Sequence, residues 1–436
     1  MNIYEEICQR AEALQDFMKV RRQDFHTYAE TGWFEIRTTS ILVDELKKMG
    51  YKVLYGKDIF DPEARMGVPD QGELDRQYER AVSQGAIQPY AQAAKDGFTG
   101  AVAILECGEG PVIGMRFDID ALGVFEESAP THRPAAEGFR SVNEGMMHAC
   151  GHDGHAAIGL GVARVLMDMK DRLHGTVKLV FQPAEEGLRG ARGIAGSGLL
   201  DDVDYMLANH MGARGAGEEQ VGLTGGKSLA STKLDAYFSG TAAHAGAVPE
   251  KGCNAMLAAA TAVLNLYAMP RHSEGGTRIN VGTLQAGSGR NVICDRAKLE
   301  IEVRGATTEI SDYLFDYARR IIESAAQMHG CSSEIKVMGA ASSMWSDEEL
   351  MERTMAVCRE KLGLNVRPPR EQGMGGSEDC AYLFDRVREH GGKAVFFNTL
   401  TPYPGPGHST IFDIREEDLP NGVKVFCGLA CDLMGL

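Results

Sequence analysis

The sequence has 436 residues, with 45 Lys and Arg against 61 Asp and Glu and a formal net charge of −16. This length exceeds the roughly 250–300 residues at which single hydrophobic cores stop growing, so we expect at least two domains. The negative charge disfavours a nucleic acid or an anionic membrane as the main partner, because both require clustered Lys and Arg. A local basic pocket for a small carboxylate remains compatible with this net negative charge.

Targeting signals are not evident. The start, Met1–Glu6, lacks the basic residues and apolar run of a secretory signal. The most apolar helical stretch, 255–269, is shorter than the roughly 20 residues that span a bilayer, so we predict no membrane span. Ten scattered cysteines indicate reduced thiols rather than a disulfide framework. We therefore expect a cytoplasmic protein.

The first half of the chain alternates helical and strand-like patterns. Apolar spacing predicts helices over 4–28 and 38–49, then a strand at 51–54 and a polar, partly helical insertion to about residue 96. Further strands are predicted at 99–105, 112–117, 176–181 and 205–209, with helical stretches such as 156–170 between them. This alternation indicates a three-layer α/β domain.

The pattern changes near residue 226. Strand, helix, strand, strand, helix and strand patterns then follow at 231–239, 255–267, 277–284, 297–304, 310–328 and 333–337. This order is typical of an α+β ferredoxin-like sandwich. After it, helix and strand patterns alternate again to the C-terminus. We predict that residues 226–338 form a small domain inserted into a discontinuous larger domain, residues 1–225 and 339–436.

The densest cluster of potential ligands is the segment 148–155, which contains His148, Cys150, His152 and His155. Thiolate and imidazole groups both bind divalent metals, and residues two apart can converge on one ion where the backbone turns. A glycine-rich turn with polar caps would explain the same residues without a metal. A nucleophilic Cys150 with a neighbouring histidine as base is a further alternative.

Three weaker signals follow strand patterns. Glu185 and Glu186 come after the strand at 176–181, so one carboxylate can bind a metal while the other acts on its water. His210 follows the strand pattern at 205–208, and His408 lies between Gly407 and Ser409. In isolation, the glutamate pair would usually lie in a solvated loop, His210 would more often be structural than a ligand, and His408 would be a weak signal. Together they occupy loops after strands, where open α/β sheets gather ligands.

In this order, the motifs resemble the metal-dependent amidohydrolases and peptidases that include carboxypeptidase G and the acyl-amino-acid hydrolases. The resemblance covers nearly the whole chain. The motifs that support the resemblance lie in the segments 116–122, 148–155, 182–187, 240–246, 287–293, 376–379 and 408–409. Within the family, the chain is most similar to the aminobenzoyl-glutamate hydrolases, and bacterial hydrolases of indole-acetyl-aspartate are close rivals.

The resemblance implies a metallopeptidase-like catalytic domain that binds two divalent metal ions, Mn²⁺ or Zn²⁺. Asp118 stands where many relatives carry a metal-binding histidine. The resemblance therefore implies that Cys150 binds metal instead and bridges the two ions. Asp120 would orient a ligand. The implied metal ligands are Cys150, His152, Glu186, His210 and His408.

The resemblance also implies Glu185 as general base and His244, on the small domain, as a donor to the oxyanion. Asn291 and Arg304 would bind the substrate carboxylate; the alternative interpretations are a turn residue at Asn291 and a strand-end surface charge at Arg304. The inserted domain would act as a lid and dimerisation domain, in a homodimer or in a heterodimer with a related protein. Expected substrates are N-acyl or N-aroyl amino acids, foremost p-aminobenzoyl-glutamate.

Two other functional classes remain open. A cysteine hydrolase that uses Cys150 as nucleophile would not need a metal, but it gives no role to Glu185 and Glu186. A non-catalytic binding protein on the same fold would not need the complete set of ligands.

Overall fold

The computed structural model describes residues 2–213, 217–370 and 376–436. Contacts divide the chain into a larger unit, Met1–Gly226, Trp345–Gly373 and Asp379–Leu436, and a smaller unit, Lys227–Met344 and Met374–Glu378. The smaller unit extends beyond the expected end at residue 338. The reason is that its last strand, β10 (Ser332–Ala341), is longer than the pattern at 333–337 suggests.

The larger unit is built on an eight-stranded mixed sheet with the order β1-β2-β4-β3-β5-β12-β6-β11. The central strands β4, β3, β5 and β12 run parallel to one another. Strands β2 and β1 continue the sheet in antiparallel pairing at one edge. The strands are β1 (Lys52–Tyr55), β2 (Ala101–Glu106), β3 (Val112–Asp118), β4 (Thr176–Gln182), β5 (Tyr205–Ala213), β6 (Val221–Thr224), β11 (Val366–Arg370) and β12 (Lys393–Thr401).

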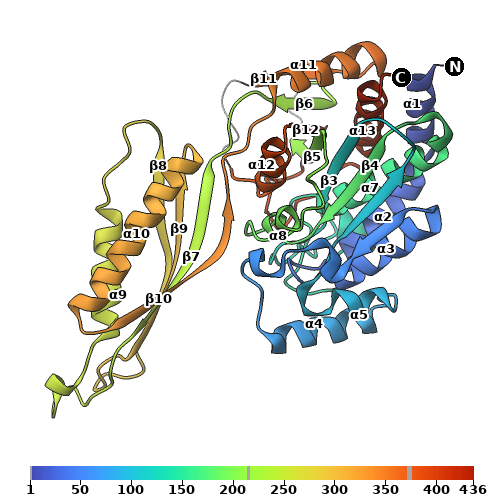
Figure 1. The fold of residues 1–436 in the computed structure, drawn as a ribbon. Coiled ribbons are helices and arrows are strands. Elements are labelled where there is room, and N and C mark those ends of the chain that lie inside the picture. Colours follow the sequence, from blue (N-terminus) through green and yellow to red (C-terminus); the bar gives the residue numbers. More distant parts are fainter. Residues whose placement is uncertain (1, 214–216, 371–375) are drawn as a thin grey trace. The chain divides into compact units, whose positions relative to one another are not determined.

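Helices cover both faces of this sheet. On one face α7 packs against β3, β4 and β5, with α2 and α13 packed on α7; on the other, α8 and α12 pack together (Figure 1). These helices are α2 (Gln15–Thr27), α7 (His152–Asp168), α8 (Ala191–Gly196), α12 (Ala381–Glu389) and α13 (Leu419–Leu433). The predicted three-layer α/β architecture is confirmed.

The N-terminal region differs from expectation in one respect. The pattern at 4–28 forms two helices, α1 (Ile3–Ala13) and α2, because the backbone leaves helical geometry at Leu14, with φ −92° and ψ 5°. Helix α3 (Ile36–Met49) ends at Gly50, whose φ of 101° suits glycine. The insertion forms α4 (Gln71–Ser83) and α5 (Tyr90–Ala94), and α5 packs on α3. The unit also contains the short helix α6 (Arg133–Glu137) and helix α11 (Glu348–Ala356).

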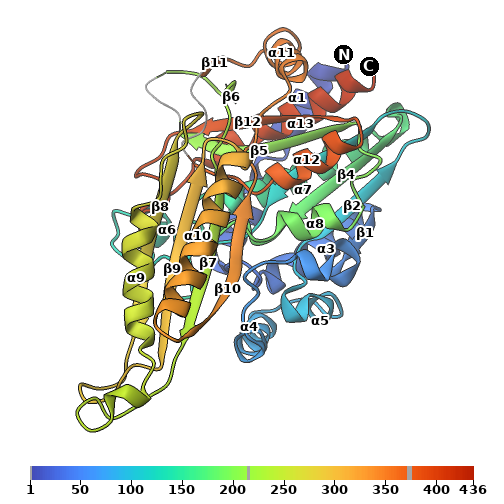
Figure 2. The same ribbon diagram turned by 60° about the vertical axis from the view of Figure 1, so that its left-hand side comes forward.

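The smaller unit is an antiparallel sheet with the order β10-β7-β9-β8, which matches the expected ferredoxin-like arrangement. Its other strands are β7 (Ala230–Ser239), β8 (Thr277–Ala286) and β9 (Arg296–Gly305). Helices α9 (Ala255–Tyr267) and α10 (Thr308–Met328) pack against this sheet (Figure 2). Their shared core includes Leu234, Leu299 and Leu314.

In the described part of the chain, no helix is both long enough and apolar enough to cross a membrane.

Candidate metal centre

The candidate site lies where neighbouring strands of the larger sheet end. Asp118 is the last residue of β3, and Gln182, shortly before Glu185 and Glu186, is the last residue of β4. His210 lies on β5, which pairs with β3. Sequence patterns placed His210 after its strand, but β5 continues to Ala213 because it pairs with β12 along its full length. These parallel strands bring their carboxyl ends to one edge.

The segment with the densest ligands turns directly into α7. Gly151 has φ 92°, a left-handed conformation that a side chain would disfavour, and the helix begins at His152. The helix thus starts earlier than the pattern at 156–170 indicated. Cys150 lies before the turn and His152 after it, so the two side chains can approach the same point.

The side chains expected as ligands converge. Cys150 Sγ lies 3.4 Å from His210 Nε2. Ligand atoms of Cys150, His152 and Glu186 all lie within 4.8 Å of one another. Glu186 Oε1 is 3.5 Å from His408 Nε2, and the His408 backbone, at φ 64°, donates its N–H to Ala149 O at 2.8 Å. Residues from four separate parts of the chain therefore surround one small volume.

Hydrogen bonds orient these groups towards that volume. His152 Nδ1 lies 3.2 Å from Asp120 Oδ1, and Asp120 Oδ2 accepts the Glu186 N–H at 2.8 Å. His210 Nδ1 donates to Met211 O at 2.6 Å, which leaves His210 Nε2 directed at Cys150. His152 Nε2 and Glu186 Oε1 are buried without a hydrogen-bond partner among the described residues. Buried polar atoms without partners are costly, so these atoms fit a metal that would bind them.

The charges also favour a cation. Burial alone would raise the pKa of the Cys150 thiol, but the adjacent His210 and His152 rings hold it well below its ordinary value. Burial and the neighbouring Cys150 sulfur raise the pKa of Glu186 to about 8. Burial opposes protonation of His210, yet Cys150 raises the pKa of that ring to about 9. A thiolate and a crowded carboxylate are groups that a divalent metal would stabilise.

His155 and Asp118 are also close to His152 and His210. However, both nitrogens of His155 are engaged: Nδ1 bonds with Asp118 Oδ1, and Nε2 accepts the Met211 N–H at 2.6 Å. Asp118 forms an ion pair with Arg116 at 2.7 Å. His155 therefore acts as a support for Asp118 and β5, and it has no nitrogen left for a metal.

The turn that carries Glu185 has a support that the sequence did not reveal. Ala184 has φ 51°, and its N–H donates to Glu35 Oε1 at 2.7 Å, while Thr99 donates to Glu35 Oε2 at 2.7 Å. Glu35 is fully buried, and burial together with Asp120 raises its pKa to about 8. Glu185 itself is buried at the edge of this turn. Glu35 is a single glutamate at the start of a helix, so the sequence gave no indication that it supports the turn before Glu185.

Comparison with known proteins assigns the family. Residues 114–432 match the profile of peptidase family M20/M25/M40. The chain belongs to this family. It is 45% identical over 410 residues, 94% of each chain, to a component of the p-aminobenzoyl-glutamate hydrolase of Escherichia coli (strain K12). It is also 45% identical, over 404 residues and 92% of each chain, to indole-3-acetyl-aspartic acid hydrolase of Enterobacter agglomerans.

A solved structure agrees with this assignment. The aminobenzoyl-glutamate utilization protein from Klebsiella pneumoniae superposes with a TM-score of 0.84 and 37% identity, covering 99% of this chain and 98% of that one. The expected relationship to metal-dependent amidohydrolases and peptidases is confirmed, and this M20 family member is a hydrolase.

The smaller unit of this M20 family member brings His244 and Asn291 together. His244 forms a bridge with Val292, and Ala245 donates its N–H to Asn291 O at 2.9 Å. His244 is exposed, and its Nδ1 accepts N–H groups from Gly246 at 3.2 Å and from Ala247 at 3.1 Å. The ring proton therefore lies on Nε2, which can donate outward.

Arg304 lies elsewhere on the smaller unit, in a pocket of about 370 Å³ that it shares with Arg271, Arg278 and Glu302. Glu302 accepts two hydrogen bonds from Arg304, at 2.8 and 2.9 Å. Three arginines against one glutamate leave this pocket net positive, which suits a carboxylate.

Proposed function

We propose that this protein hydrolyses the amide bond between an aroyl or acyl group and an amino acid, with p-aminobenzoyl-glutamate as its foremost substrate. The observation that most strongly supports this proposal is the convergence of one cysteine, three histidines and a glutamate in a member of a hydrolase family. Relatives named for aminobenzoyl-glutamate and indole-acetyl-aspartate are equally identical to the chain, so indole-acetyl-aspartate is the second candidate.

Two divalent ions, Mn²⁺ or Zn²⁺, fit the donor set of this site. The groups that would hold them are Cys150, His152, Glu186, His210 and His408. When bound, such ions polarise a carbonyl and lower the pKa of water. Soft thiolate favours Zn²⁺, whereas the surrounding carboxylate and imidazole groups also suit Mn²⁺.

Glu185 is the proposed general base. Its carboxylate would accept a proton from the attacking water and later pass that proton to the leaving amine nitrogen. The turn at Ala184, held by Glu35, fixes the direction of the chain at this point. Asp120 positions His152 and the Glu186 backbone together, which keeps the neighbouring carboxylate in place.

Three residues of the smaller unit are proposed to recognise the substrate. His244 Nε2 would donate a hydrogen bond to the developing oxyanion. Asn291 and Arg304 would bind the α-carboxylate of the amino acid, and the cationic pocket around Arg304 supports that role. Substrates without a carboxylate should then bind weakly.

Self-association through the smaller unit is also proposed. Strand β8 is an edge of its sheet, and α9 exposes Leu257, Leu264 and Tyr267. An open strand edge beside an apolar helix suits pairing with a second copy or with a related protein. A lid function for this unit is part of the same proposal. We also propose a cytoplasmic location, which the lack of disulfide bonds among the cysteines of the described residues supports.

One observation favours a different mechanism. The short separation of Cys150 and His210, together with the lowered pKa of the Cys150 thiol, resembles the thiolate and imidazolium pair of a cysteine hydrolase. Such an enzyme would work without metal. The buried Glu186 and His152 atoms that lack hydrogen bonds within the described residues have no role in that mechanism.

The proposal is tested by measuring hydrolysis of several N-acyl amino acids with added Mn²⁺ or Zn²⁺. The panel would contain p-aminobenzoyl-glutamate, indole-acetyl-aspartate, hippurate and N-acetyl amino acids. We expect the highest kcat/KM for p-aminobenzoyl-glutamate. A higher value for indole-acetyl-aspartate would reassign the substrate, and no hydrolysis of any compound by metal-loaded protein would favour a binding protein.

A further inference from the structure

A buried arginine on α2 joins three carboxylates. Arg22 is completely buried, and its Nε forms an ion pair with Asp153 Oδ2 at 2.8 Å. Its two terminal nitrogens donate to Asp413 Oδ1 at 2.8 Å and to Glu416 Oε1 at 3.1 Å. All three carboxylates are buried. The guanidinium therefore donates hydrogen bonds to Asp413 and Glu416, and it contacts Asp153 through a buried ion pair at Nε.

These carboxylates belong to the segments that carry the proposed metal ligands. Asp153 directly follows His152 in the first turn of α7, and Gly151 separates that turn from Cys150. Asp413 follows His408 on the segment that leads into α13. Arg22 therefore connects two ligand-bearing segments that are far apart in the sequence.

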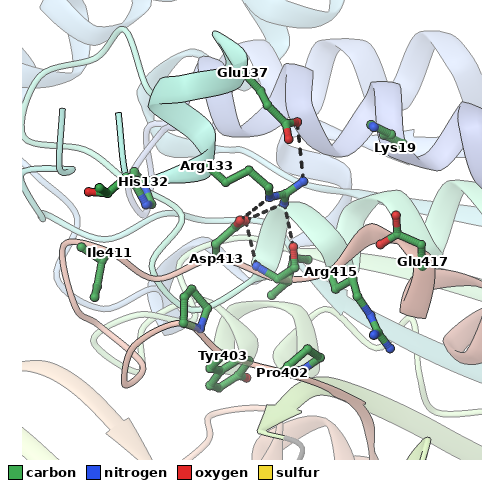
Figure 3. A pocket seen from close by; sticks show the side chains of 13 residues that line it. Lys19, His132, Arg133, Glu137, Pro402, Tyr403, Ile411, Asp413, Arg415 and Glu417 are labelled. Atoms are coloured by element: carbon green, nitrogen blue, oxygen red, sulfur yellow. Dashed lines mark hydrogen bonds and ion pairs between the residues drawn. The ribbon is translucent and has the colours of Figure 1, made fainter. Parts of the chain in front are cut away.

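A second arginine strengthens one side of this network. Arg133 Nε and Nη2 donate to the two oxygens of Asp413 at 2.6 and 2.9 Å (Figure 3). Its Nη1 also donates to Glu416 at 2.6 Å. Arg133 lines a pocket of about 730 Å³ and is partly exposed, whereas Arg22 is closed off from solvent. Arg22 differs from Arg133 in that it also contacts Asp153 and so reaches α7.

We propose that Arg22 is a positioning residue for the metal centre. It fixes the spacing between the start of α7, which carries His152, and the segment that carries His408, so that these ligands converge before metal binds. This inference rests on the proposed metal-dependent function. Supports behind metal ligands typically contribute roughly 10- to 100-fold to metal affinity.

The test replaces Arg22 with lysine, which keeps the charge but cannot reach three acceptors at once. We expect the Kd for Mn²⁺, measured by calorimetry on folded protein, to rise at least about 10-fold. We also expect the visible and near-ultraviolet bands of the Co²⁺-loaded protein, which report ligand geometry and the thiolate, to change. The kcat should fall with little change in KM, because the substrate contacts remain.

Arg37→Lys is the matched control. Arg37 is also a buried arginine, and it forms a bidentate ion pair with Asp24 of α2, with hydrogen bonds of 2.8 and 2.9 Å. Its Nε donates to Gln84 O at 3.0 Å, so these bonds lie outside the ligand-bearing segments. Arg37→Lys should lower the Tm but leave the Mn²⁺ Kd and the Co²⁺ spectrum unchanged. Should Arg22→Lys fail to fold, Asp413→Asn weakens the connection to the His408 segment alone, and the same rise in Kd is expected.

The outcomes separate this inference from the proposed function. If the unaltered protein binds metal and hydrolyses substrate, while Arg22→Lys or Asp413→Asn shows only a lower Tm, Arg22 is merely structural and the inference is wrong. An equal loss of affinity in Arg37→Lys would also overturn it. If the unaltered protein binds no metal, the proposed function itself fails.

Discussion

Replacement of Glu185 by glutamine is expected to lower kcat about 100-fold or more while the metal content stays unchanged. Glutamine keeps the size of the side chain but cannot accept a proton. Because Glu185 is buried beside a turn that Glu35 anchors, the substitution should leave the surrounding backbone in place. The measurement combines steady-state kinetics with metal analysis of the same sample.

Glu186→Gln serves as the contrast, because Glu186 is adjacent in sequence and has a different proposed role. Glu186 Oε1 is buried without a hydrogen bond to any described residue and lies near His408. Its replacement should therefore reduce bound metal, and activity should recover in part at high metal concentration. If instead Glu185→Gln loses the metal and Glu186→Gln keeps it, the two roles must be exchanged.

Removal of the His244 imidazole is expected to have an effect of similar size. His244→Ala should lower kcat about 10²–10³-fold without loss of metal, as is typical for loss of an oxyanion donor. The N–H groups of Gly246 and Ala247 hold the ring in the tautomer with the proton on Nε2. His272, which is partly exposed on the smaller unit and also accepts a backbone N–H, provides a matched control: His272→Ala should retain normal kcat.

A mixing experiment determines whether His244 serves its own chain or a partner. Inactive Glu185→Gln chains would be combined with inactive His244→Ala chains, and mixed dimers would be isolated. Recovery of part of the activity is expected if one chain supplies His244 to the site of the other. No recovery in verified mixed dimers would mean that His244 acts within its own chain or has no catalytic role.

Much of the fold could be predicted because local patterns determine it. Period-two and helical spacing located the central strands and the βαββαβ order of the smaller unit. Element ends were less predictable, since tertiary pairing sets them. Strand β5 extends past His210 because β12 pairs with it, and α7 begins at His152 because Gly151 can adopt a left-handed conformation.

The candidate ligands could be predicted for a different reason. Cysteine, histidine and paired glutamates are rare in such combinations, and family resemblance supplied their roles. The residues behind them carried no such signal. Arg22 and Glu35 are single polar residues in or beside ordinary helices, and their importance arises from contacts with partners as distant in sequence as Asp413 and Ala184. Only the folded arrangement reveals these contacts.

Metal removal tests the central claim most directly. Hydrolysis of p-aminobenzoyl-glutamate would be measured before chelation, after chelation and dialysis, and after addition of Mn²⁺ or Zn²⁺, with metal content determined at each stage. We predict that activity disappears with the metal and returns as up to two ions bind per chain. Full activity in the metal-free protein, abolished instead by alkylation of Cys150, would contradict the two-metal mechanism and establish a cysteine hydrolase.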